Sequence, residues 1–339
     1  MKKLLGIVGP ILILTACGSK THIPDVSGVQ ADVSVVRFDE SFFQIDTNRL
    51  GTEMVALSQA HPVFYAEFME NVLGLPNNDS SASTQENLRF FFRGYRPLFD
   101  TLRVEYKKVD DIQRAVQEGI RFVRHYFPNY PTKKNLIFFV GPFDAPGAAV
   151  SREGIAIGLQ QFAGANFSFY ASPQGQELFP SYISRRFERP YIAVNCLKLI
   201  TKEVCPDTVG TGPLITQMIR RGKEAWLLDR FLPVTADEVK LGYTKAQLAW
   251  CKENEALIWS YFLKNVDLQS TDPDVIQNFL GEAPFTTGVD QEHSPGNLGT
   301  WVGRQIVQAY MEKNPKTTPA DLVRIDPEKI LEGATYKPR

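Results

Sequence analysis

Apolar residues recur with helical spacing along most of the chain. The clearest helix is predicted over residues 110–126, where apolar side chains return every three or four positions. They are Ile112, Val116, Ile120 and Val123. The same spacing, with caps and prolines at the ends, predicts further helices. These cover residues 46–59, 63–73, 86–92, 98–102, 191–204, 213–231, 244–265 and 298–313.

Two short apolar runs in the middle of the chain have the pattern of buried strands. Residues 136–140 precede Gly141-Pro142, and residues 154–159 form a second run of the same kind. Because Pro146 and Gly147 lie between them, we expect a hairpin-like pair in one small sheet. A short strand is also expected near residues 35–39. Helices on both sides of a small sheet predict an α+β fold that is predominantly helical.

The N-terminus has the features of an export signal. Lys2 and Lys3 precede an apolar run over residues 4–14, which is too short to cross a bilayer as a permanent helix, since that needs about 20 residues. Leu14-Thr15-Ala16-Cys17 resembles the lipobox that lipoprotein signal peptidase cleaves. This resemblance implies lipid on Cys17, with acyl chains such as palmitate anchoring the protein to a membrane.

We therefore expect three parts in the chain. They are a lipoprotein signal peptide over residues 1–16, a lipid-anchored tether over 17–34, and a single mostly helical body over 35–339, with an N-terminal helical part (35–130) followed by the sheet and C-terminal helices (131–339). Gly18-Ser19-Lys20 lacks the Asp after the lipidated Cys that retains enterobacterial lipoproteins in the inner membrane. It also lacks the Lys-plus-acidic cluster of surface-exported lipoproteins. We expect the outer membrane, with the body facing the periplasm.

Composition argues against nucleic acid as a partner. Removing Lys2 and Lys3 leaves 35 basic and 38 acidic side chains, a formal charge of −3, and no basic tract. The chain is 43% hydrophobic and 12% aromatic, which is enough for one large core or two smaller ones. No second apolar segment is long enough to span a membrane.

Three cysteines remain besides Cys17. In an oxidising compartment, Cys196, Cys205 and Cys251 could supply one disulfide and one buried thiol, or three buried thiols. Cys196 and Cys205 could pair only if the chain turns between them, and Pro206 suggests such a turn.

The layout of strands followed by helices resembles that of the zincin metalloproteases. Those enzymes need H-E-x-x-H on one helix, so that two histidines meet one zinc ion, and a third ligand on a later helix, often within E-G-x-A. Here the histidines are His22, His61, His125 and His293, and no two lie close in sequence. Arg221 stands at the third ligand position, beside Gly222 and Ala225. We expect no metal, no cofactor and no catalytic residues; the outline is either a degenerate zincin-like fold lacking H-E-x-x-H or a coincidence.

Other catalytic and binding motifs are absent or only weakly indicated. The chain has no G-x-S-x-G elbow, P-loop or G-x-G-x-x-G. Cys251 has no histidine in sequence reach, which favours a buried thiol, and His293 in a turn-rich loop is expected to be solvated. Arg185, Arg186 and Arg189 are candidates for contact with an anion or a partner carboxylate, because guanidinium groups bind carboxylates bidentately. The alternative is a set of surface salt bridges.

Short segments through most of the mature chain match one known family and keep its order: Val36-Arg37-Phe38-Asp39, Phe42-Phe43, Pro180-Ser181-Tyr182-Ile183, Arg185-Arg186, Met218-Ile219-Arg220-Arg221-Gly222-Lys223, Trp250-Cys251-Lys252-Glu253-Asn254-Glu255, Phe285-Thr286-Thr287-Gly288, Ser294-Pro295-Gly296-Asn297-Leu298-Gly299, Trp301-Val302-Gly303, Ile306-Val307, Tyr310-Met311 and Tyr336-Lys337-Pro338. Through these segments the chain is similar to the gliding motility lipoprotein B family (GldB) of Bacteroidota. The resemblance carries over one functional residue, the lipidated Cys17. It implies an envelope lipoprotein needed for gliding, in bacteria whose motility is tied to type IX secretion.

The leading hypothesis is a non-enzymatic envelope lipoprotein. It would act as an accessory or assembly component of gliding motility or type IX secretion machinery, with envelope proteins as partners and the membrane bound through Cys17. The alternatives are a zincin-derived module that binds a peptide or a glycan, and an atypical metallopeptidase.

Overall fold

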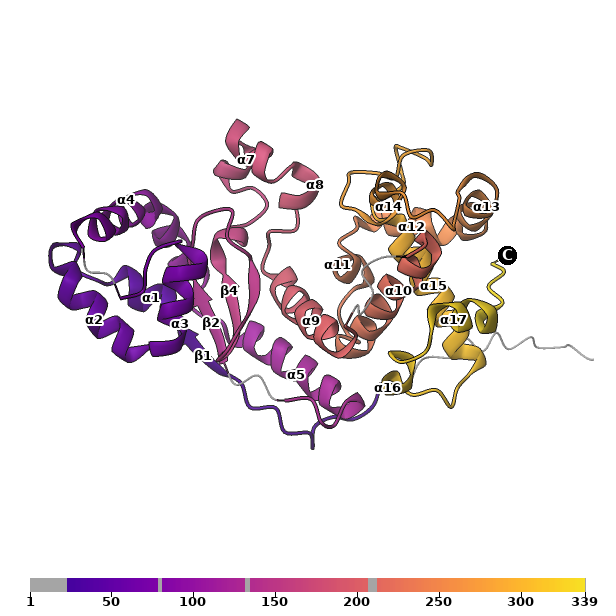
Figure 1. Ribbon diagram of the computed structural model, residues 1–339, viewed down its shortest axis with the longest axis horizontal. Coiled ribbons are helices and arrows are strands. Elements are labelled where there is room, and N and C mark those ends of the chain that lie inside the picture. Colours follow the sequence, from indigo (N-terminus) through magenta and orange to yellow (C-terminus); the bar gives the residue numbers. More distant parts are fainter. Residues whose placement is uncertain (1–22, 79–80, 132–134, 207–211, 339) are drawn as a thin grey trace, which may run out of the picture.

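The computed structural model describes residues 23–78, 81–131, 135–206 and 212–338. A small sheet lies in the middle of an elongated molecule, with helices α1–α4 at one end and most of the C-terminal helices at the other (Figure 1). This arrangement confirms a predominantly helical α+β fold. Cys17 and the predicted signal peptide lie outside the described residues.

The N-terminal helices are α1 (Phe38–Phe43), α2 (Leu50–Ala60), α3 (Pro62–Glu67) and α4 (Ala82–Glu105), with a 3-10 turn at Thr47–Arg49 and a π-helical turn at Phe68–Val72. Between the N-terminal helices and the C-terminal part come α5 (Asp110–Tyr126), a 3-10 turn at Leu159–Gln161, and three short helices, α6 (Ser168–Ala171), α7 (Pro173–Leu178) and α8 (Ser181–Ser184). The C-terminal part comprises α9 (Pro190–Val204), α10 (Leu214–Phe231), α11 (Asp237–Leu241), α12 (Lys245–Glu253), α13 (Glu255–Asn265), α14 (Pro273–Leu280), α15 (Leu298–Lys313), α16 (Pro319–Leu322) and α17 (Pro327–Ala334).

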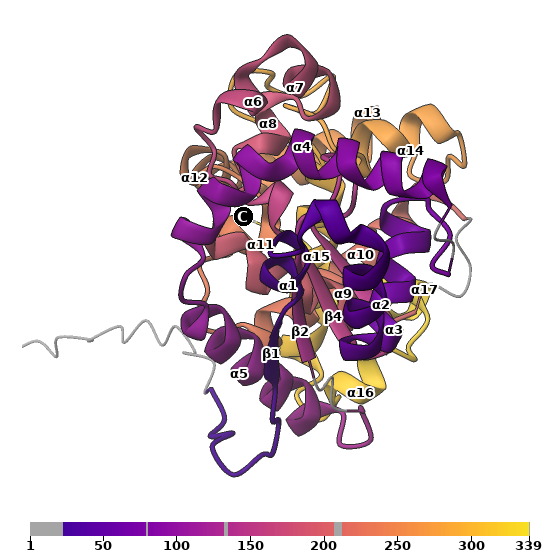
Figure 2. The same ribbon diagram turned by 90° about the vertical axis from the view of Figure 1, so that its left-hand side faces the viewer.

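The sheet contains four strands in the order β1-β2-β4-β3. Strands β1 (Ser34–Arg37), β2 (Asn135–Phe139) and β4 (Gly154–Gly158) are parallel, and β3 (Ala148–Ser151) runs antiparallel to β4. Figure 2 shows β1, β2 and β4 side by side beneath α4. Helices α1 and α3 lie on one side of the sheet, and α5 and α9 on the other (Figure 1).

The expected hairpin between the two central runs is wrong, although both runs are strands of one sheet. Strands β2 and β4 pair in parallel, with Ile137 opposite Ala156. The chain between them forms β3, which makes the antiparallel pair with β4 instead. Sequence analysis missed β3 because Ala148–Ser151 is a run of only four residues without a strong apolar signal.

Helix α4 is continuous where two helices were expected. Pro97 lies inside it, and a proline in a helix interior normally costs about 3 kcal/mol or more. Aromatic packing against α1 offsets this cost: the rings of Phe43 and Phe99 stack at 4.5 Å between centroids, and those of Phe42 and Phe92 at 4.6 Å. The opposite error occurs after residue 244, where the single helix expected over 244–265 divides into α12 and α13 at Asn254.

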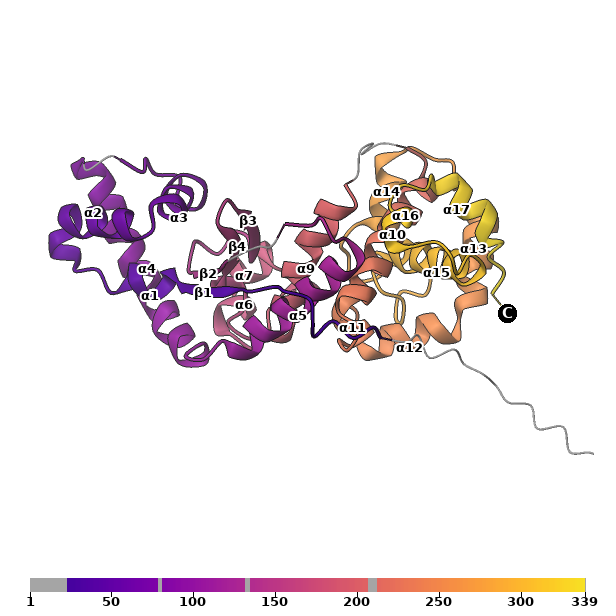
Figure 3. The same cartoon turned by 90° about the horizontal axis from the view of Figure 1, so that it is seen from below.

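The segment expected to be a tether is partly held against the body. Val26, Ala31 and Val33 are buried. Two side chains of α5 bind its backbone: Arg124 donates to the carbonyl of residue 30, and Gln113 donates to that of Val33 at 2.6 Å. Figure 3 shows this segment running from β1 along α5 toward α11. The unattached part of the predicted tether 17–34 is therefore shorter than the sequence indicated.

Helices α10 and α15 approach each other closely through two glycines. A Cβ atom on Gly222 of α10 would overlap the backbone of Gly303 of α15, and one on Gly303 would overlap the carbonyl group of Met218. Gly222, whose sequence context resembled the zincin E-G-x-A motif, thus has a packing role. The contact fixes the axis of α15 against α10 and places the N-terminal end of α15 beside α9.

We predict that Gly303→Ala lowers the free energy of unfolding by about 3 kcal/mol or more, because overpacking costs about 1–3 kcal/mol even where side chains can shift. Gly94→Ala is the matched control, since a Cβ there meets nothing within 4 Å. It should raise stability by about 0.5–1 kcal/mol, the usual gain for a helix-interior glycine. Urea denaturation followed by circular dichroism measures both, and equal stability of Gly303→Ala and wild type would contradict the close contact.

Candidate functional site

A cleft of about 290 Å³ lies among α9, α10, α11 and the beginning of α15. Charged residues from α9 and α10 line it, including Lys198, Lys202, Arg221 and Glu224. The segment from Leu280 to Thr300, which joins α14 to α15, contributes Glu282 and Asn297. The cleft therefore collects charged groups from parts of the chain up to about a hundred residues apart.

Lys198 is the most unusual side chain of the cleft. Within the described part of the chain, its ammonium group makes no hydrogen bond or ion pair, although the residue is only partly exposed. Burial lowers the pKa of Lys198 to about 8; the positive charge of Arg186 acts in the same direction and the negative charge of Glu282 opposes it. A buried cation without a partner is unfavourable, so this group would gain from an anion in the cleft.

Asn297 provides a second polar group without a partner. It precedes α15 in the left-handed conformation, at φ 59°, which asparagine tolerates better than most residues. Its backbone carbonyl accepts hydrogen bonds from the Tyr243 hydroxyl at 3.1 Å and from the backbone N–H of Thr300 at 3.1 Å. Its side-chain amide oxygen, however, is buried and has no hydrogen-bond partner among the described residues.

Most other charges of the cleft are paired. Arg221 lies 3.4 Å from Glu224 on the same helix, and Arg186 binds Glu282 through two hydrogen bonds of 3.1 and 3.0 Å. Lys240 lies 2.6 Å from Asp229 and 2.9 Å from Asp237. Lys198 is thus a cation in the cleft whose charge no adjacent carboxylate directly balances.

Apolar side chains form the rest of the wall. They are Ala225 and Leu228 of α10, Leu241 of α11 and Leu280 at the end of α14. A pocket that combines a few convergent polar groups with an apolar wall is the usual form of a small-ligand site. The cleft therefore suits a ligand with one charged end and an apolar portion.

The three arginines singled out from sequence do not meet in one place. Arg185 donates to the carbonyl of Gly242 at 2.6 Å, and Arg186 binds Glu282. Arg189 binds Asp111 at 2.8 Å and lies over the ring of Tyr106. Arg185 and Arg186 line one small hollow together with Gly242 and Glu282, and Arg189 does not line it. The ion pairs of Arg186 and Arg189 correspond to the salt-bridge alternative, whereas Arg185 binds the backbone. An anion or partner contact at these arginines stays a prediction.

The other residues discussed from sequence have ordinary surroundings. Cys196, Cys205 and Cys251 are buried and form no disulfide with one another, so the Cys196–Cys205 bridge is not formed. Burial raises the pKa of Cys196 and of Cys251 to about 12, which leaves both thiols protonated at neutral pH. His293 is 53% exposed and lies 2.9 Å from Asp290 in a surface loop.

No cluster of three or more metal-binding side chains occurs in residues 23–78, 81–131, 135–206 and 212–338. Arg221, at the position where a zincin would have its third ligand, is 48% exposed and paired with Glu224. Among the helices within these ranges, none is long and apolar enough to cross a membrane.

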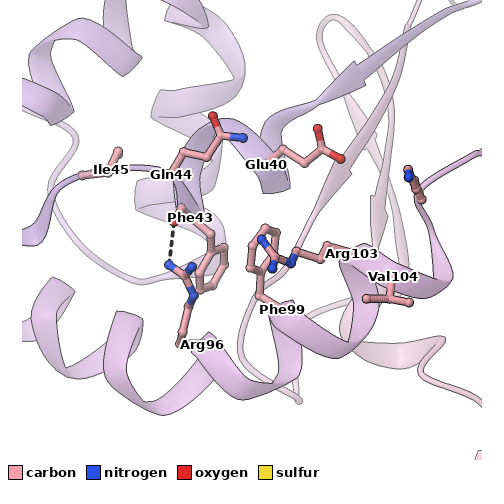
Figure 4. Close-up of a pocket in the computed structure, with 9 residues that line it drawn as sticks. Glu40, Phe43, Gln44, Ile45, Arg96, Phe99, Arg103 and Val104 are labelled. Carbon is pink, nitrogen blue, oxygen red and sulfur yellow. Dashed lines mark hydrogen bonds between the residues drawn. The ribbon is translucent and has the colours of Figure 1, made fainter.

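A larger groove lies between α1 and α4, with a volume of about 750 Å³. Figure 4 shows Arg96 donating to the carbonyl of Phe43, at 3.0 Å, beside the ring of Phe43, which stacks on that of Phe99. Arg103 lies 3.5 Å from Asp100, and Glu40 lies 3.0 Å from Arg37. Its carboxylate and guanidinium groups bind one another or the backbone, and its one lysine, Lys107, is exposed to solvent. The groove therefore has no partly buried cation without a partner of the kind that Lys198 provides.

Sequence reasoning missed both Lys198 and Asn297 as site residues. The signals were present: Lys198 is the one charged residue in the run Tyr191–Ile200, and Asn297 follows a glycine just before a helix. Neither signal reveals that the two side chains line one cleft, because that depends on how α9, α10 and α15 pack.

A comparison with protein families establishes the family to which the chain belongs. The family model described as gliding motility protein GldB matches residues 19–338, almost the whole chain. The chain belongs to the GldB family. This membership confirms the resemblance seen in the sequence and indicates a gliding-motility-related lipoprotein of the cell envelope. No curated protein and no solved structure matches the chain. The zincin resemblance therefore has no support from known structures.

We predict that substitutions of two charged neighbours shift the pKa of Lys198 in opposite directions in this GldB protein. Glu282→Gln removes a negative charge and should lower the pKa of Lys198 further; Arg186→Met removes a positive charge and should raise it. Trace labelling with acetic anhydride between pH 6 and 10, read by mass spectrometry, reports the pKa as the midpoint of reactivity. Lys245, on the exposed side of α12, is the reference for labelling efficiency. Shifts in the same direction, or no shift in either variant, would contradict the assigned surroundings.

Proposed function

We propose that this protein is a non-enzymatic accessory or assembly component of gliding motility or type IX secretion machinery. The match to the GldB family over residues 19–338 is the observation that carries this proposal. The buried, protonated thiols, the solvated His293 and the missing zinc ligands support a role without catalysis. The protein would bind other envelope proteins of the machinery.

The proposal includes a lipid anchor on Cys17 in the outer membrane, with the body in the periplasm. Five residues lie between Cys17 and Ile23, where the described chain begins, so the two are six residue steps apart. A fully extended chain of that length spans at most about 20 Å, at roughly 3.3–3.6 Å per residue. Since residues 26–33 are held against α5, the lipid would keep the body close to the membrane surface. Partners embedded in or lying on the same membrane would then be within reach.

Deletion of the gene in the native host tests this function. We expect loss of colony spreading, loss of secretion of a type IX cargo, or both, with recovery on return of the wild-type gene. Normal spreading together with normal secretion in the deletion strain would contradict the proposed role and leave the family relationship as ancestry.

The anchor is tested separately by Cys17→Ala. This variant lacks the thiol that carries lipid, so we expect a folded, soluble body in the periplasm that does not restore the deletion strain. Ser19→Ala is the control, because it alters the same segment but leaves the lipidated thiol in place. Cell fractionation and colony spreading measure both variants; full restoration by unlipidated Cys17→Ala would show that the anchor is dispensable.

One observation favours a second function, a module that binds a peptide or a glycan. The cleft between α9 and α15 contains the Lys198 ammonium group, which has no partner among the described residues, and it is also lined by Asn297, whose buried amide oxygen has none either. Unmet polar groups facing a cleft are a common feature of binding sites, because a ligand relieves the cost of their burial. This function is compatible with a place in the motility or secretion machinery.

A further inference from the structure

A ligand of the Lys198 cleft has two polar groups to satisfy, one a hydrogen-bond donor and the other an acceptor. The ammonium group of Lys198 needs a hydrogen-bond acceptor, and a charged acceptor satisfies it best. The amide oxygen of Asn297, which the surrounding atoms screen from solvent, lacks a donor, and a turn of this side chain toward the cleft lets a ligand N–H or O–H supply one. A ligand that satisfies both must therefore carry an anionic group and, near it, a hydrogen-bond donor.

The charge balance of the cleft selects a monoanion. Glu224 and Glu282 line the same cleft, and each lies beside an arginine that already partners it. A dianion such as phosphate would face these two carboxylates at short range, and like charges repel strongly where water is scarce. A single carboxylate matches the ammonium group of Lys198, since Lys202, the other lysine of the cleft without a carboxylate partner among the described residues, is exposed to solvent.

The apolar wall and the size of the cleft add a third requirement. Leu228, Leu241 and Leu280 offer contacts to an aliphatic group. A volume of about 290 Å³ lies at the lower end of the range for small-ligand pockets, which suits the last residue or two of a chain. A fatty acid would fill the wall and meet Lys198, but it has no N–H for Asn297.

We infer that the cleft binds the carboxyl terminus of a polypeptide whose last side chain is apolar. The terminal carboxylate accepts from the Lys198 ammonium, and the Asn297 side chain turns so that its amide oxygen accepts from the last peptide N–H. The apolar side chain lies against Leu228, Leu241 and Leu280. This inference rests on the second function proposed above, the binding module, and names its ligand. It does not require that the host glides.

The test compares two peptides that differ only at their end. Acetyl-Gly-Ala-Leu with a free carboxylate and the same peptide as the carboxamide are titrated into the full mature lipoprotein in detergent micelles, by calorimetry at pH 7. We expect the acid to bind at least tenfold more tightly than the amide. In Lys198→Met this preference should disappear, whereas Lys245→Met on α12 should keep it.

Folding of the variants can be checked independently. The unfolded chain binds more protons than the folded one between the lowered pKa of Lys198, about 8, and the ordinary lysine value, so stability rises with pH in that window. At pH 7, Lys198 therefore opposes folding, and Lys198→Met should melt no lower than wild type. Asn297→Gly, which tolerates the left-handed backbone, should weaken the acid and the amide peptide equally.

Several outcomes would overturn the inference. They are equal binding of acid and amide, no binding of either at millimolar concentration, an acid preference that survives in Lys198→Met, and unchanged affinity in Asn297→Gly. Octanoate and inorganic phosphate are titrated in parallel; binding of either one without the peptide would replace the proposed ligand by a fatty acid or a phosphate. Because these experiments use purified protein, their failure is separate from a normal spreading and secretion phenotype, which would instead contradict the motility role.

Discussion

The contact between α10 and α15 determines the geometry on which the candidate site depends. Gly222 and Gly303 let the two helix backbones meet where any larger residue would separate them. This contact places the first turn of α15 beside α9, so that Asn297 and Lys198 line the same cleft. A shift of α15 by the width of one methyl group would change the distance between these side chains, although neither residue touches the glycines. The close packing of these two helices thus determines the shape of the candidate binding cleft.

Ion pairs fix the positions of the elements around the cleft relative to one another. Asp229 of α10 binds both Lys240 of α11, at 2.6 Å, and Arg304 of α15, at 2.6 Å. Arg186 and Glu282 then fix the segment before α15 against the end of α8. Buried ion pairs contribute more to specific geometry than to stability in some proteins, because desolvation offsets much of the attraction. Here they leave Lys198 without a direct counter-ion in the described chain, and unlike Lys202, which also lines the cleft and is exposed to solvent, it is only partly exposed.

The sequence predicted local structure well and the site poorly. Helices α5 and α15 have the bounds that their apolar periodicity predicted, since each has one clear buried stripe and clear ends. Helix α4 was misjudged because Pro97 is overridden by the stacking of Phe43 on Phe99, a contact between residues far apart in sequence. Lys198 and Asn297 escaped for the same reason. Both side chains have a polar group without a hydrogen-bond or ion-pair partner in the described chain. Only the packed structure shows which polar groups these are.

The central claim is that the Lys198 cleft holds the carboxyl end of a chain. Its most direct test is a crystal structure of the mature protein grown with a peptide that ends in leucine carboxylate. The account predicts the terminal carboxylate within hydrogen-bond distance of Lys198 Nζ and the leucine side chain against Leu228. A peptide bound elsewhere, such as in the groove between α1 and α4, or a cleft that stays empty at saturating peptide, would contradict it.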